Sequence, residues 1–301
     1  MPTFDPTPHR PTTVTHVVES RFGLDGGAMF GIIPRPLWAK TNPPDAQNRI
    51  DMVSRCLYIE YPASPHPDLH PDRPTRVLVD VGMGTNWDAK STSIYNIHDQ
   101  DPGLARHLAA SRIEAGDIDH VILTPLPFDH VGGLRRQDEQ GAWRASFPNA
   151  THWVQQRNWS WAHGPSARDA GSYRQDDFAF LAHDDAPALE LVAGTKEILP
   201  GIEVYPHNGH TWGMQVVRVT DHTGQVYAFA ADLIPTSSHL RDPYVMGYDL
   251  NPVTTVEEKR TLLHEAARHD WIVVYQHDPV VAASRVRFDG RGRPVAEPVE
   301  G

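Results

Sequence analysis

The sequence predicts an α+β fold in which two sheets pack back to back with helices on their outer sides. Strand-like runs occur in both halves of the chain, and the helical patterns do not alternate strictly with them, which favours separate α and β layers. The length of 301 residues suits one large domain or two small ones. A chain of this size buries a core without help from disulfides or a structural metal.

The first half of the chain supplies four strands and one helix. We expect strands at 56–61, 76–81, 120–123 and 151–154. Five prolines between 62 and 74 predict a stiff loop that joins the first two strands as neighbours. Leu104, Leu108 and Ile113 recur at near-helical spacing and predict a helix over 102–115, with Gly116 as its stop signal.

The second half predicts four more strands and a longer helix. We expect the strands at 202–205, 214–220, 226–230 and 271–275, with a hairpin turn at 221–224, and loops with short helical turns at 155–190. A helix is expected over 254–269, capped by Thr254 or Thr255, with Glu257 and Glu258 in its first turn. The predicted organisation is an extended arm at 1–19, one domain at 20–283 and a tail at 284–301.

Composition excludes several functional classes. The net charge of −11 and the sequence pI near 5.9 argue against a nucleic-acid partner or an anionic membrane surface. No apolar stretch is long enough for a membrane span, and the N-terminus lacks the apolar region of a secretory signal, so we expect a cytoplasmic protein. A single cysteine, Cys56, excludes an internal disulfide and a Cys-rich zinc motif. The 18 histidines instead suggest a His/carboxylate metal site.

Four loops that each follow a predicted strand contain His and Asp side chains. Rigid strand ends are natural positions for a functional site. The loops span 124–133, 206–211, 230–233 and 275–278. A lone His or Asp in such a place is more often a structural residue, and the sequence alone does not show that the four loops converge.

The chain from about residue 20 to residue 280 resembles the metallo-β-lactamase-fold hydrolases, and within them the lactonase-like group. The matching metal-motif residues are, in chain order, Asp129, His130, Gly132, Gly133, 208–211, Asp232 and His277. Segments 24–38, 78–84 and 232–250 also resemble this group. The resemblance implies a four-layer αββα sandwich with metals at one edge of the two sheets.

Two prolines interrupt the metal motif. The family has an H-x-H pair where this chain has Pro125 and Pro127, and proline offers no side-chain donor atom. In the family, that pair and the histidine matched by His210 hold the first metal. The resemblance therefore implies that His210 and Asp232 alone remain of the first site, while Asp129, His130, Asp232 and His277 remain of the second. One divalent metal at most is expected, with Zn²⁺ favoured over Mn²⁺ or Fe²⁺, and no metal at all is the alternative.

Three functions remain open. The first is a mononuclear metallohydrolase of an ester, a lactone or a similar carbonyl compound, in which Asp129 orients or accepts a proton and His210 acts as an electrophilic or acid–base group. The second is a catalytically lapsed or disabled scaffold that acts as a binding protein. The third is metal-independent acid–base chemistry in the same pocket. His207, His120 and His152 are the nearest candidates for a compensating ligand, although each is expected to be structural.

The resemblance also suggests a substrate pocket for a small molecule. Its expected lining includes Met29, Phe30, Trp38, His239 and Tyr248. An apolar mouth of this kind suits an acyl or aromatic group, and Tyr248 could donate to a developing oxyanion. If the loop with Met29, Phe30 and Trp38 is exposed, it could also serve as a homodimer contact.

Overall fold

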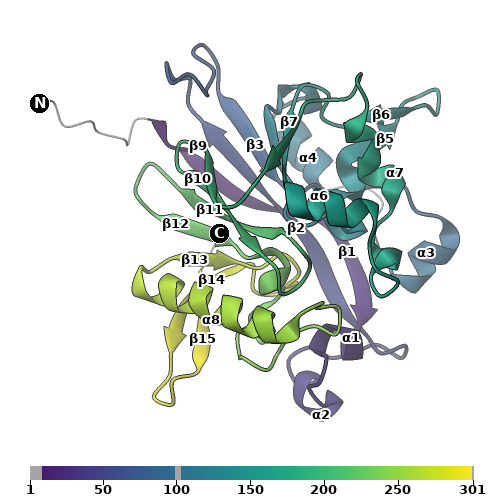
Figure 1. Cartoon of the computed structure of the whole chain (residues 1–301), viewed down its shortest axis with the longest axis vertical. Coiled ribbons are helices and arrows are strands. Elements are labelled where there is room, and N and C mark those ends of the chain that lie inside the picture. The colour runs from purple at the N-terminus through teal and green to yellow at the C-terminus, as the bar shows by residue number, and fades with distance from the viewer. Residues whose placement is uncertain (1–8, 99–102, 300–301) are drawn as a thin grey trace, which may run out of the picture.

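Two sheets face each other at the centre of the molecule, with helices outside both (Figure 1). The computed structural model describes residues 9–98 and 103–299. The first sheet has the strand order β1-β2-β3-β4-β7-β8. Its strands are β1 (Thr13–Asp25), β2 (Arg49–Tyr61), β3 (Thr75–Val79), β4 (His120–Ile122), β7 (Thr151–Gln155) and β8 (Leu189–Val192). Strands β1, β2 and β3 pair antiparallel, whereas β3, β4, β7 and β8 run parallel.

The second sheet has the order β15-β14-β13-β12-β11-β10-β9. Its strands are β9 (Lys196–Leu199), β10 (Ile202–His207), β11 (Met214–Thr220), β12 (Val226–Phe229), β13 (Ile272–Val274), β14 (Ala283–Phe288) and β15 (Pro294–Pro298). Only β12 and β13 pair in parallel within it. A separate hairpin joins β5 (Arg135–Gln137) to β6 (Trp143–Ala145).

Helices cover the outer face of each sheet. Figure 1 shows α4 and α6 beside the first sheet and α8 along the second. The α-helices are α1 (Gly26–Phe30), α2 (Arg35–Trp38), α3 (Ala89–Ile94), α4 (Gly103–Ala110), α5 (Phe128–Val131), α6 (Gln156–His163), α7 (Gln175–Phe178) and α8 (Pro252–Arg268). Short 3-10 helices are η2 (Ala115–Asp117), η3 (Gly132–Leu134), η4 (Ala170–Ser172), η5 (Ala179–Ala182), η6 (Ala231–Leu233) and η7 (Ser237–His239).

Strand β2 shows how the sequence builds two apolar layers at once. Leu57, Ile59 and Tyr61 pack in the core between the sheets, while Cys56 and Tyr58 pack on the opposite side under the helices. This alternation follows from the two-residue period of a strand, and it explains why the run contains few polar residues. Full burial of one such aliphatic side chain stabilises the fold by about 1.5–3 kcal/mol.

The four-layer α+β architecture predicted from the sequence is confirmed. The predicted strands lie within one to two residues of observed strands, except that β2 begins at Arg49, earlier than expected. The helix predicted over 102–115 is shorter than expected: α4 ends at Ala110, and Arg112 has a φ of 56°, a left-handed conformation that interrupts a helix. Residue 102 lies outside the described residues.

The predicted cap of the longest helix is wrong. Helix α8 begins at Pro252, with Asn251 as its N-cap, because proline suits the first helical position. Thr254 and Thr255 therefore lie inside the helix. Glu258 accepts hydrogen bonds from the backbone N–H groups of Asn208 (2.8 Å) and Gly209 (3.0 Å), so it anchors the loop before His210.

Parts of the expected arm and tail pair within the two sheets. Strand β1 starts at Thr13 and pairs along its length with β2, so residues 13–19 of the extended arm belong to the first sheet. Strands β14 and β15 occupy most of the expected tail and extend the second sheet. Residues 1–8 of the expected arm and 300–301 of the expected tail lie outside the described part of the chain. Within that part, no helix combines the length and hydropathy needed to cross a bilayer.

Candidate metal centre

The four loops predicted from the sequence meet at one edge of the two sheets. Asp129 and His130 lie on α5, which follows β4, and Asp232 lies on η6, which follows β12. His277 follows β13, and His210 follows β10. Because β4 is parallel to β3 and β13 is parallel to β12, the carboxyl ends of these strands bring their loops together.

Three imidazoles converge on the carboxylate of Asp232. Its Oδ2 lies 3.1 Å from Nε2 of His130 and 3.0 Å from Nε2 of His210. Its Oδ1 lies 2.9 Å from Nε2 of His277. All four side chains are almost fully buried, so their charges interact with little screening by water.

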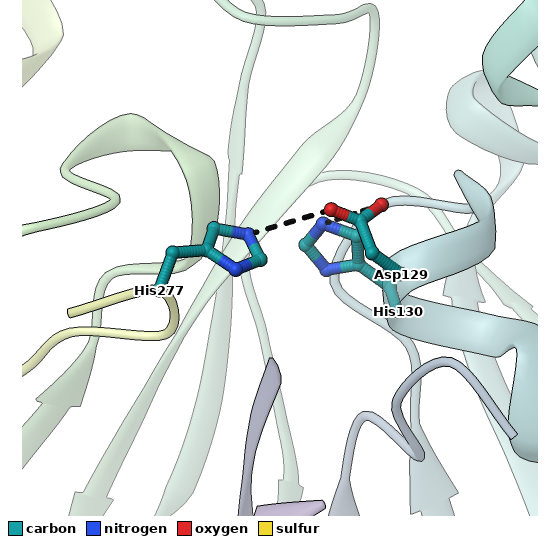
Figure 2. Close-up of side chains that lie close together, drawn as sticks. All are labelled: Asp129, His130 and His277. Carbon is teal, nitrogen blue, oxygen red and sulfur yellow. Dashed lines mark ion pairs between the residues drawn. The ribbon is translucent and has the colours of Figure 1, made fainter. Parts of the chain in front are cut away.

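Asp129 completes a compact group with two of these histidines. Its carboxylate oxygens lie 3.8 Å from Nε2 of His130 and 3.7 Å from Nε2 of His277. Figure 2 shows the carboxylate of Asp129 and both rings turned toward a common space. One ligand atom from each of the three residues lies within 4.8 Å of the others, a spacing that one metal ion could bridge.

The other ring nitrogen of each histidine has a fixed partner. Nδ1 of His130 lies 3.0 Å from Asp80 Oδ2, Nδ1 of His210 lies 2.9 Å from Asp249 Oδ1, and Nδ1 of His277 lies 2.9 Å from the carbonyl of Val53. Metal-binding histidines typically have such partners, which orient the ring and leave Nε2 for the ion. The contacts of the three Nδ1 atoms therefore orient the three Nε2 atoms toward the carboxylate of Asp232.

The carboxylate of Asp80, which is the partner of His130, is itself held by hydrogen bonds. It accepts hydrogen bonds from the hydroxyl of Thr124 (2.6 Å) and from the amide of Gln276 (2.9 Å). Asp80 adopts a φ of 57°, which aspartate tolerates better than most residues. The segment between the strand end and α5 is thus tied to the first sheet beneath the metal ligands.

The charges of the cluster shift the pKa values of its members in opposite directions. Burial by itself lowers the pKa of His210, but the charge of Asp232 and the hydrogen bonds to Asp232 and Asp249 outweigh burial and raise it to about 10. Asp232 and Asp129 likewise raise the pKa of His130, against the effect of burial. Burial raises the pKa of Asp232, but the three charged imidazoles bring it well below its usual range.

This donor set fits a divalent cation. Asp232 Oδ1 and His277 Nε2 are buried and, despite their ion-pair contact, neither makes a hydrogen bond. Unpaired buried polar atoms are costly, and a cation between them would satisfy both. Imidazole nitrogens and carboxylate oxygens suit Zn²⁺, Mn²⁺ and Fe²⁺, and the ion would replace the protons that the cluster otherwise retains.

The two prolines of the interrupted motif lie beside this cluster. Both are buried, and Pro127 lines the same pocket as His210 and Asp232. Pro127 has a φ of −62° and a ψ of 161° and directly precedes α5, so the loop keeps an extended path into the helix. At this position the pocket lining is a pyrrolidine ring, which has no ligand atom.

A pocket of about 200 Å³ opens above the cluster. Asp129, His210, Asp232 and His277 contribute its polar part. Its apolar lining includes Leu24, Met29, Met52, Tyr95, Phe128 and Met246. A mainly apolar cavity with a few convergent polar groups is the usual form of a small-molecule site.

The expected pocket residues divide into two groups. Met29 and Tyr248 line the pocket. Phe30, Trp38 and His239 do not: they are buried behind it, where Phe30 stacks on both Trp38 and His239. Met29, Phe30 and Trp38 are themselves buried, so these three side chains do not provide an exposed contact, and the homodimer stays a prediction.

None of the three candidate compensating ligands belongs to the metal cluster. His207 pairs with Glu258 at 3.6 Å, and His120 accepts a hydrogen bond from the indole of Trp153 at 3.2 Å. His152 is buried, and burial lowers its pKa to about 4. Their structural environments agree with the expectation that each has a packing role.

A buried lysine anchors the segment that forms one side of the pocket. Lys259 on α8 donates hydrogen bonds to the carbonyls of His239 (2.9 Å), Arg241 (2.9 Å) and Tyr244 (2.8 Å). Burial lowers its pKa to about 8, although the charge of Asp249 opposes this effect. The anchored segment leads directly to Met246, Tyr248 and Asp249, so the lysine sets the position of one pocket wall.

We expect Lys259→Met to destabilise the protein by roughly 3 kcal/mol or more, because three carbonyls lose a charged donor in a buried site. Chemical denaturation of the full chain measures this loss. Arg260→Met is the matched control on the next position of α8. Its guanidinium forms an exposed ion pair with Asp242, so its loss should lower stability far less than the loss of Lys259. Equal losses in the two variants would contradict the anchoring role.

Several positioning roles were not predicted from the sequence, although the resemblance placed Asp249, in segment 232–250, near the site. Asp80, Gln276 and Asp249 hold the histidines, and Tyr95 and Met246 line the pocket. Asp80 is an acidic residue inside the otherwise apolar end of the strand predicted at 76–81, which was an available signal. The positions of Asp249 and Met246 depend on long-range packing that no local pattern reports.

Comparisons with known proteins agree with this geometry. Residues 75–277 match the family described as the Metallo-beta-lactamase superfamily. The chain is 26% identical over 204 residues to N-acyl homoserine lactonase AttM of Rhizobium radiobacter, covering 64% of this chain and 71% of that protein. It is 27% identical over 233 residues to a probable metallo-hydrolase of Mycobacterium bovis, covering 67% and 71% respectively.

Solved structures share the fold over nearly the whole chain. A probable metal-dependent hydrolase from Staphylococcus aureus superposes with a TM-score of 0.78 at 24% identity, covering 96% of this chain and 98% of that one. AidC, described as a dizinc quorum-quenching lactonase, superposes with a TM-score of 0.72 at 17% identity, covering 97% and 98%. At these identities the likeness establishes the architecture.

Proposed function

Because this chain belongs to the metallo-beta-lactamase superfamily, we propose that it is a hydrolase of a small-molecule ester, lactone or similar carbonyl compound with one metal ion in its site. The observation that carries the proposal is the convergence of three Nε2 atoms and two carboxylates at the base of an apolar pocket. Relatives named as N-acyl homoserine lactonases support a carbonyl substrate with an apolar group.

Asp129, His130 and His277, together with Asp232, would hold the ion. These imidazole and carboxylate ligands favour Zn²⁺ over Mn²⁺ or Fe²⁺. A divalent cation there supplies Lewis-acid activation of a carbonyl group and of water. A second ion is not expected, because Pro125 and Pro127 contribute no ligand atoms opposite His210.

The protein's own groups would orient the substrate and move protons. Asp129 orients a water molecule or accepts its proton, and His210 exchanges a proton at Nε2 while Asp249 fixes its Nδ1. Tyr248 is 38% exposed at the pocket and could donate a hydrogen bond to a developing oxyanion. The apolar wall of Met29, Met52 and Phe128 would receive an acyl or aromatic group.

The test combines metal analysis with turnover. We expect about one equivalent of metal per chain after loading with Zn²⁺ or Mn²⁺, and hydrolysis of a lactone or aryl ester that a chelator abolishes. An anomalous-scattering map should place the ion among Asp129, His130 and His277. Substoichiometric metal together with turnover equal to the blank would overturn the proposal in favour of a binding scaffold. Turnover that a chelator does not affect would favour metal-independent acid–base chemistry instead.

The proposal describes a cytoplasmic enzyme that acts on small molecules. The acidic net charge of −11 supports the absence of a nucleic-acid partner, because phosphate backbones are bound by basic surfaces.

A further inference from the structure

A second cavity, of about 270 Å³, lies beneath α4 and shares no lining residue with the pocket above the metal cluster. We name it the α4 pocket. Its walls are mainly apolar and include Val81, Leu104, Leu108, Ile113 and Phe147. Ala105 and Ala109 on α4 also line it and are exposed, so the cavity reaches the surface beside this helix.

The α4 pocket contains one deeply buried carboxyl group. Glu19 on β1 is 3% exposed and lines the cavity. Its carboxylate accepts hydrogen bonds from the backbone N–H groups of Met83 (2.9 Å) and Gly84 (3.3 Å). In the described part of the chain no cationic side chain forms an ion pair with it. Burial raises the pKa of Glu19 to about 7, although the two N–H groups and the charge of Arg106 oppose the shift.

The surroundings hold this carboxyl group in place. A Cβ on Gly82 would lie 2.1 Å from the Glu19 carboxylate, and a Cβ on Gly84 would lie 2.4 Å from the carbonyl of Gly132. The turn that binds Glu19 is therefore wedged between β1 and the segment after α5. A carboxylate fixed in this way is preorganised for a ligand, because little side-chain freedom remains to be lost on binding.

Two arginines line the cavity, and a third, Arg106 on α4, acts on Glu19 through its charge. Arg135 is engaged with Asp176 at 3.2 Å and stacks on Trp143, with 4.2 Å from its Cζ to the ring centre. Arg136 is exposed on the rim. A ligand that enters beside α4 therefore meets apolar walls and the buried carboxyl group of Glu19.

From this arrangement we propose that the α4 pocket is a second ligand site, which binds a small primary amine with a short apolar body. The ammonium group would lie against the Glu19 carboxylate and form a direct ion pair with it. The apolar body would cover the side chains of Leu104, Leu108 and Phe147. This site is separate from the proposed hydrolytic pocket and does not depend on its chemistry.

The test uses three probes of matched size on the full metal-free chain: phenethylamine, 2-phenylethanol and 3-phenylpropanoate. Calorimetry or ligand-observed NMR measures binding. We expect saturable binding of the amine that is at least about tenfold tighter than binding of the alcohol or the acid. Glu19→Gln, which keeps the size of the side chain, should remove this preference.

A second pair of variants locates the site. Ala109→Phe places a ring at the pocket's opening and should abolish amine binding, whereas Ala110→Phe, also exposed on α4 but outside the pocket, should not. Three outcomes would overturn the proposal: no saturable binding of the amine, alcohol or acid binding as tight as amine binding, or amine binding that survives both Glu19→Gln and Ala109→Phe. Because Ala109 and Ala110 are both exposed, these two variants are expected to fold.

Discussion

Replacing Asp232 with asparagine is expected to eliminate metal binding and hydrolysis together. Its carboxylate is the one group within 3.1 Å of all three clustered imidazoles. Asparagine keeps the shape but removes the negative charge that offsets the cation. We expect bound metal to fall from about one equivalent to a small fraction, and turnover to fall by more than about 100-fold, beyond the usual loss for an outer partner of a metal ligand.

The control for this variant is another buried aspartate. Asp221→Asn changes a carboxylate that accepts hydrogen bonds in the turn between β11 and β12, at the opposite end of β12 from Asp232. It should lower stability somewhat and leave the metal content unchanged. Elemental analysis and a denaturation curve of both variants separate the two effects. An Asp232→Asn protein that keeps full metal content would show that Asp232 is not a ligand.

The paired change Pro125→His and Pro127→His is expected to raise the metal content from about one equivalent to about two. Both positions are buried, and Pro127 lines the pocket with His210 and Asp232, so the new imidazoles would complete the side of the cluster that has no ligand atoms. Each exchange also frees the backbone in the unfolded chain and should cost about 0.4–1 kcal/mol of stability.

Equilibrium dialysis with elemental analysis counts the ions, and X-ray absorption should reveal a metal–metal distance of about 3.5–4 Å, as in two-metal hydrolases. The double change Pro125→Ala and Pro127→Ala is the matched control, because it relaxes the same backbone without adding ligands. It should bind no second ion. A histidine variant that folds but binds no more metal than its alanine counterpart would mean that His210 and Asp232 are not placed to share an ion.

Local sequence patterns predicted much of the fold. The short, nearly continuous apolar runs in β2, β3 and β11 identify these segments as strands. The loops with Asp129, Asp232 and His277 follow strands that the same kind of pattern identifies. Strand β1 was missed because residues 13–25 mix polar and apolar side chains without a clean period. It forms because its backbone pairs with β2, which is a long-range interaction.

Local sequence patterns could not predict that the site residues lie close together in the fold. Asp129 and His277 are brought together by the packing of two sheets, and only the resemblance to a known family anticipated it. The loop at 24–38 shows the same limit, because its local sequence did not predict which of its side chains line the pocket. Phe30, Trp38 and His239 have the composition of a pocket lining, yet their stacked rings form the packing behind it. Composition does not distinguish residues that line a pocket from residues that pack behind it.

The distribution of the cluster between the two sheets also has a consequence for folding. Asp129 and His130 come from the first sheet's half of the chain, whereas His210, Asp232 and His277 come from the second. Contacts between residues so distant in sequence form late, because the entropy of closing a long loop must be overcome first. Ion-binding capacity should therefore arise only when the two halves have docked, which makes metal uptake a reporter of the last step of folding.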